Sequence, residues 1–96
     1  MKARLIWVGK SKSQQDAILR NGRYTTVARF GEEDEGDWLK EAWSLDLSEL
    51  TIESDEAMIA SVRFLSPDAP VDRLRPDMTF ELYEGRKCTA RGKIIG

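Results

Sequence analysis

The chain has 96 residues, of which 41% are hydrophobic and 33% are charged, and its formal net charge is −2. This composition is typical of one globular domain with a single core and argues against a disordered chain. The apolar patch after Arg4 ends by Lys10, which is too short for a signal-peptide core or for the roughly 20 residues that cross a bilayer. We therefore expect a cytoplasmic protein that makes no membrane contact.

The sequence contains one cysteine, Cys88, and no histidine. A single thiol excludes a disulfide within the chain, and a zinc site would have to take its other ligands from carboxylates. Without histidine, acid–base chemistry near neutral pH lacks its usual side chain, and a histidine-dependent triad is excluded. We expect no enzyme activity, no cofactor and no metal site, with Cys88 as a structural thiol on the inward face of the last strand.

Charge is unevenly distributed along the chain. Residues 1–29 carry seven basic residues and one acidic residue (7 − 1 = +6), and residues 86–96 carry four basic residues and no acidic one (+4). Residues 30–85 carry 4 basic and 16 acidic residues (4 − 16 = −12). If the first and last strands are neighbours, they form a basic patch opposite an acidic one. The alternative is that the two signs neutralise each other across the sheet.

The segment Leu5–Val8, which follows Ala3 and Arg4, predicts the first strand. Ala3, Leu5 and Trp7 share one face of it. Because Ile6 and Val8 are apolar too, the second face is also a candidate for burial.

Residues Gln14–Arg20 fit one or two helical turns, with Ser13 as the N-cap and Asn21-Gly22 as the stop. An extended loop that buries Ile18 and Leu19 is the alternative.

Three further strands follow. Side chains of two kinds alternate along Arg23–Phe30, along the segment from Trp43 to Leu47 and, most strongly, along Glu56–Leu65, as is typical of β-strands. Residues 31–37, between the first two of these strands, form an acidic loop, but its carboxylates lack the spacing of an EF-hand calcium site. A brief helical turn is expected over residues 38–43. Residues 66–77 contain three prolines and form an irregular loop, which Val71 and Leu74 are expected to anchor on the core.

The end of the chain predicts a β-hairpin, because two alternating runs meet at Glu84-Gly85-Arg86. If paired residues share a face, Leu82 lies opposite Cys88 and Phe80 opposite Ala90. This pairing requires a three-residue connection or a bulge. Six strands with turn-rich connections and at most short helical turns indicate an all-β fold, a small six-stranded antiparallel β-barrel in one domain.

Several motifs in the second half resemble the C-terminal β-barrel domain of translation elongation factor Tu. They are RFLSPDAP (63–70), LRPD (74–77), FELYEGR (80–86) and ARGKI (90–94), with a weaker similarity over 21–30. The chain departs from that family in lacking a glycine between Pro76 and Asp77 and in having no GTP-binding loop. The resemblance implies a barrel fold and contacts with the T-stem of aminoacyl-tRNA and with an exchange factor. Glu84, Gly85 and Arg86 are the positions that match the RNA-facing region.

The sequence does not identify a function by itself. The first hypothesis is a non-catalytic binding module whose partner is another protein or a second copy, although Trp7, Trp38 and Trp43 fit the core better than an interface. The second is RNA binding through a basic face, with no DNA expected, and the third is a small immunity or inhibitor protein that uses its acidic surface. The candidate contact residues are Arg23, Arg29, Glu84, Gly85, Arg86, Lys87, Arg91 and Lys93.

Overall fold

The computed structural model describes residues 1–30 and 43–96. The acidic loop and Trp38 therefore lie outside the described residues, as does most of the expected helical turn. The elements in chain order are β1 (Lys2–Trp7), α1 (Lys12–Asn21), β2 (Arg23–Phe30), β3 (Trp43–Ile52), β4 (Ala57–Phe64), a 3₁₀ turn η1 (Val71–Arg73), β5 (Thr79–Glu84) and β6 (Lys87–Ile94).

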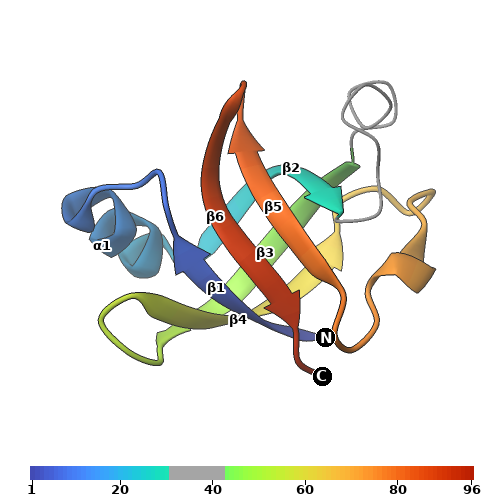
Figure 1. Ribbon diagram of the computed structural model, residues 1–96, viewed down its shortest axis with the longest axis horizontal. Helices are drawn as coiled ribbons and strands as arrows, with labels where there is room; N and C mark the ends of the chain where they lie inside the picture. The colour runs from blue at the N-terminus through green and yellow to red at the C-terminus, as the bar shows by residue number, and fades with distance from the viewer. Residues whose placement is uncertain (31–42) are drawn as a thin grey trace.

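The strands close into a barrel in the order β1–β4–β3–β2–β5–β6, and the antiparallel pairing of β6 with β1 completes the circle. Figure 1 shows β5, β6 and β1 on the near side of the barrel, with the two chain ends close together. The prediction of an all-β, six-stranded antiparallel barrel is confirmed within the described parts of the chain. Among these residues, no helix has both the length and the apolar character that crossing a membrane requires.

The interior is filled by inward-facing residues from every strand of the barrel. They include Ala3, Leu5, Trp7, Ala28, Phe30, Leu45, Leu47, Ala60, Val62, Phe64, Phe80, Leu82, Ala90 and Ile94. The prediction for the first strand is half right. Trp7 belongs to the core, but Ile6 is 46% exposed and Val8 is 52% exposed, so the second face is only partly covered.

The helix extends further than the sequence predicted, and its cap is Ser11 rather than Ser13. The Ser11 hydroxyl accepts a hydrogen bond from the Gln14 backbone N–H, and the Gln14 side chain accepts one from the Ser11 N–H at 2.8 Å. Gln14 follows Ser11 by three residues, which is the spacing of a capping box, whereas Asp16 follows Ser13. Figure 1 shows α1 beside the end of the barrel where β1 ends and β2 begins.

The closing hairpin contains the predicted bulge but not the predicted three-residue connection. Glu84 pairs with Lys87, so the turn is two residues long, and Gly85 adopts φ 62°. The register shifts between Leu82 and Tyr83, so that Leu82 pairs with Ala90 and Tyr83 with Cys88. The expected partners of Leu82 and Phe80 were therefore wrong.

The shift leaves Thr89 as the extra residue of a β-bulge. Residues of β6 that precede Thr89 therefore point to the side of the sheet opposite to the one that strict alternation predicts. Thr89 is buried, while Cys88 turns to the outer surface, with its Sγ 3.8 Å from a carboxylate oxygen of Glu81. The expected inward position of Cys88 was wrong for this reason. In the loop before β5, Leu74 is buried as predicted, but Val71 is exposed.

Candidate partner-binding surface

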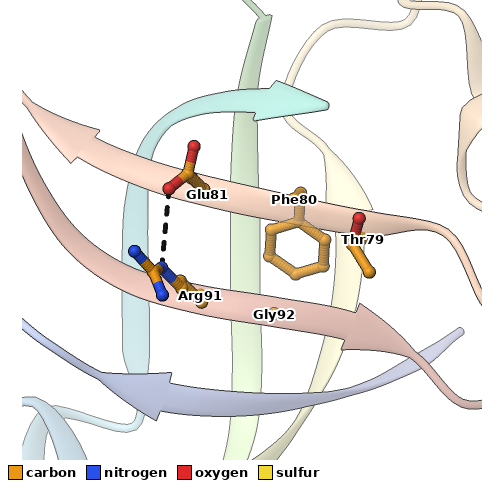
Figure 2. Close-up of a pocket in the computed structure, with 5 residues that line it drawn as sticks. All are labelled: Thr79, Phe80, Glu81, Arg91 and Gly92. Carbon is orange, nitrogen blue, oxygen red and sulfur yellow. Dashed lines mark ion pairs between the residues drawn. The ribbon is translucent and has the colours of Figure 1, made fainter. Parts of the chain in front are cut away.

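A carboxylate flanked by two arginines lies on the outer face of β2, β5 and β6. The strand registers place Arg29 opposite Glu81 and Glu81 opposite Arg91. Arg29 Nη1 lies 3.9 Å from one Glu81 oxygen and Arg91 Nε 3.6 Å from the other, and the second pair is drawn in Figure 2. The Tyr83 hydroxyl donates to the same carboxylate at 3.3 Å. We call Arg29, Glu81, Tyr83, Cys88 and Arg91 the Glu81 cluster.

Burial raises the pKa of the Cys88 thiol, and the charge of Glu81 raises this pKa further. The thiolate is the reactive form of cysteine, so this environment makes Cys88 a poor nucleophile at neutral pH. Within the described residues, moreover, no three or more carboxylate or thiol side chains gather as a metal site would require.

Two shallow hollows lie on either side of β6, and both are lined by Arg91 and Gly92. The hollow between β5 and β6 has a volume of about 270 Å³ and is shown in Figure 2. The hollow between β6 and β1 has a volume of about 200 Å³. The first is lined by Thr79, Phe80, Glu81, Arg91 and Gly92, the second by Arg4, Ile6, Arg91, Gly92 and Lys93.

The exposed aliphatic residues Ile6 and Val8 lie close to β6, because Ile6 lines the second hollow and the Val8 backbone N–H donates to the Thr89 carbonyl of β6 at 3.0 Å. We call the exposed residues Arg4, Ile6, Val8, Arg91 and Lys93, with the two hollows, the β6–β1 face. It combines half-exposed aliphatic side chains with cations, and such a surface can bind carboxylate or phosphate groups while burying apolar area.

The cations of the β6–β1 face differ in how firmly they are held. Arg4 donates two hydrogen bonds to Glu53, at 2.7 and 3.0 Å, and this pairing lowers the pKa of Glu53. Arg91 and Lys93 have looser contacts of 3.6 Å with Glu81 and Asp77. Exposed ion pairs of this length contribute little stability, so these two side chains can exchange partners easily.

Arg23 lies elsewhere, in a second arginine–carboxylate–arginine arrangement. It donates two hydrogen bonds to Asp46, at 2.7 and 3.1 Å, and Arg63 and Thr25 donate to the same carboxylate. The bonds from Arg23, followed by those from Arg63 and Thr25, lower the pKa of Asp46, although burial opposes this. Asp46 is 3% exposed.

Glu84 belongs to a third group, at the α1 end of the barrel. It pairs with Lys10 at 2.5 Å and accepts a hydrogen bond from the Tyr24 hydroxyl at 2.6 Å, and these contacts lower the pKa of Glu84. Burial, together with the bond to Glu84, raises the pKa of Tyr24 to about 12. The Tyr24 hydroxyl also bonds to Thr89 at 2.9 Å, and the Tyr24 ring packs edge-on against Trp7.

The structure therefore divides the predicted contact residues among separate places. Arg29 and Arg91 share Glu81, and Arg91 and Lys93 lie together on the β6–β1 face. Arg23 belongs to the Asp46 arrangement and Glu84 to the Tyr24 group. Gly85, Arg86 and Lys87 lie at the tip of the β5–β6 hairpin.

Sequence reasoning missed Arg4, Ile6 and Glu81 as parts of a site. The alternation of Arg4, Ile6 and Val8 was a usable signal, since it leaves exposed apolar residues beside a cation on one strand face. The sequence left open whether the basic ends form a patch or are neutralised by the acidic middle of the chain. For the pairs described above the structure shows neutralisation, since basic residues from both ends contact acidic residues from the middle.

The fold places the chain in the class of closed six-stranded antiparallel β-barrels. Comparison with known proteins found no match, whether to a family model, a curated protein or a solved structure. The similarity to the elongation factor Tu barrel accordingly stays a prediction from sequence motifs.

Proposed function

We propose that the protein is a non-catalytic binding module that recognises another protein through its β6–β1 face. The observation that carries this proposal is the half exposure of Ile6, which lines the same hollow as Arg4 and Arg91. Interfaces are enriched in arginine and in apolar side chains that lose water on binding, with a charged rim around them. Ile6 lies beside Arg4 on the outer face of β1, and a partner that covers Ile6 would gain from burying its side chain.

The side chains with chemical reactivity support a binding role rather than catalysis. The Cys88 thiol has a raised pKa. The Tyr24 and Glu84 side chains bond to each other, and Glu84 is also paired with Lys10. These contacts stabilise the α1 end of the barrel. The single cysteine and the absence of histidine support the same proposal, which is a cytoplasmic protein without enzymatic activity.

The proposal is tested by affinity purification of the tagged protein from its own cell, with mass spectrometry of the captured proteins. We expect Ile6→Gln to abolish capture of proteins that the wild type enriches. Leu65→Gln is the matched control, because Leu65 is 52% exposed and follows β4 at the far end from Ala57, the partner of Ile6. Circular dichroism verifies that both variants are folded. If Ile6→Gln captures the same proteins as the wild type, the proposal is wrong.

RNA binding through the basic face is the second candidate, and one observation favours it. The Arg29–Glu81–Arg91 arrangement carries one positive charge in excess, on side chains suited to phosphate. The elongation-factor-like motifs point the same way. Against it, a carboxylate lies within 4 Å of each of these arginines and of Lys93, and the pI is about 5.2. The immunity-protein alternative rests on residues 31–37, outside the described residues.

A further inference from the structure

We infer that the partner segment is acidic and extended, and that one of its carboxylate side chains enters the hollow between β6 and β1. This inference rests on the proposed function and adds the chemistry of the partner to it.

The charge of one hollow favours an anionic occupant. The hollow between β6 and β1 is lined by three cations, Arg4, Arg91 and Lys93, and by no described carboxylate. The hollow between β5 and β6 is lined by one charge of each sign, Arg91 and Glu81. Arginine binds carboxylates in a bidentate geometry, which gives direction as well as attraction. An anionic side chain therefore finds complementary charge in the hollow between β6 and β1, where it competes with Glu53, Glu81 and Asp77 for the three cations.

The Glu81 cluster allows Arg91 to change partners without leaving the Glu81 carboxylate unpaired. When Arg91 turns towards a carboxylate in a hollow, Glu81 keeps its contact with Arg29 at 3.9 Å and its hydrogen bond from the Tyr83 hydroxyl. The Arg91 side chain is 70% exposed and its contact with Glu81 is 3.6 Å long, so little stability is lost. Arg4, by contrast, is held in place by two hydrogen bonds to Glu53, and its charge is largely paired.

The size of the hollows indicates side chains rather than a small molecule. Their volumes of about 270 and 200 Å³ lie below the range of roughly 300–1,000 Å³ that is usual for ligand pockets. One hollow lies on each side of β6, so they are about one strand spacing apart, ~4.8 Å. Side chains on one face of an extended segment repeat every ~7 Å. Two such side chains are too far apart to occupy both hollows, so we expect one carboxylate, in the hollow between β6 and β1.

The aliphatic residues favour a protein segment over a nucleic acid. Ile6 lines one hollow and Val8 lies next along the chain, and both are about half exposed. An apolar side chain between or beside the acids would cover them and gain from burial. Single-stranded nucleic acids would require exposed aromatic rings for stacking, and neither hollow is lined by one, since Phe80 is 2% exposed.

The test is selection from an unbiased peptide library displayed on phage, followed by fluorescence polarisation with the enriched peptides. We expect peptides rich in Asp and Glu with interspersed aliphatic residues. Arg91→Gln combined with Lys93→Gln should weaken their binding by about tenfold or more. Arg86→Gln combined with Lys87→Gln removes the same charge at the hairpin tip and should leave binding unchanged. Peptides in which Asn and Gln replace the acids should not bind.

The outcomes separate the two proposals. If no peptide is enriched over selection on empty beads, and the cell extract also yields no partner that depends on Ile6, the proposed function fails. If the enriched peptides are neutral or basic but their binding depends on Ile6, the protein-binding function stands and the acidic partner is wrong. Equal loss in the two double variants overturns the hollow between β6 and β1 as the site. Displacement of the peptide by structured RNA at lower concentration makes nucleic acid the occupant and overturns the inference.

Discussion

The Gly92 position shows how closely the core approaches the proposed surface. A Cβ atom at this position would lie 2.2 Å from Cζ of Phe80, a distance at which atoms overlap. The interior is close-packed, so the ring has little room to move. Gly92→Ala is expected to lower the free energy of unfolding by about 1–3 kcal/mol, measured by urea denaturation. In a Phe80→Leu background the same substitution should cost clearly less, and an unchanged cost would show that the ring is not the cause.

Asp46 is the carboxylate whose titration should be visible in the stability of the protein. Hydrogen bonds from Arg23, and then from Arg63 and Thr25, lower the pKa of Asp46 in the folded state. The unfolded chain therefore takes up the proton first, at a pH of about 4. The stabilisation by Asp46 is complete above that pH, and it is lost as pH falls through the lower pKa of the folded state.

We therefore expect Asp46→Asn to destabilise the protein by about 1–3 kcal/mol at neutral pH and by less in acid. Urea denaturation over a series of pH values measures this difference. Asp55→Asn, at an exposed aspartate between β3 and β4, is the control and should follow the wild type throughout. A difference between Asp46→Asn and the wild type that is the same at every pH would contradict the assignment.

At the scale of single elements, the β5–β6 hairpin determines how fast the Cys88 thiol is alkylated. Because the Thr89 bulge turns Cys88 outwards, iodoacetamide should modify it in the folded protein, but slowly, since burial and the charge of Glu81 raise the pKa of the thiol. Glu81→Gln removes one of these causes and should accelerate alkylation near neutral pH. Mass spectrometry follows the rate, with the unfolded protein as the reference. Alkylation at the same rate in both proteins would show that Glu81 does not act on the thiol.

The strands could be predicted from the sequence because alternation is a local property. β2 has the bounds that the sequence predicted, and β4 differs from its prediction by one residue at each end. The hairpin register could not be predicted, because it depends on distant partners. Thr89 turns inwards to bond with the hydroxyl of Tyr24, 65 residues away along the chain, and with the carbonyl of Leu82. The alternation of side chains within the hairpin does not reveal the contact with Tyr24, so it could not predict the bulge at Thr89.

At the scale of the whole molecule, the barrel topology decides which charges meet. β2 lies between β3 and β5, although β3 and β4 separate β2 from β5 along the chain. This adjacency brings Arg29 to Glu81, and the β2–β3 and β3–β4 pairings bring Arg23 and Arg63 to Asp46. The sequence predicted that basic ends and an acidic middle exist, but the choice between a patch and neutralisation required the strand order. The β6–β1 face likewise exists only because the first and last strands pair.

The same pairing of charges predicts weak binding to RNA. Affinity for nucleic acid comes mainly from cations that neutralise phosphates, and here Arg29, Arg91 and Lys93 already have carboxylate partners. In gel shifts with structured RNA we expect weak binding at low salt and none at physiological salt. Glu81→Gln combined with Asp77→Asn should strengthen binding and steepen its salt dependence, because it releases these cations. Asp77 has φ 72°, which asparagine tolerates, so the fold should persist. Tight, steeply salt-dependent binding by the wild type, unchanged in the double variant, would show that the carboxylates do not neutralise the face and would favour RNA as the partner.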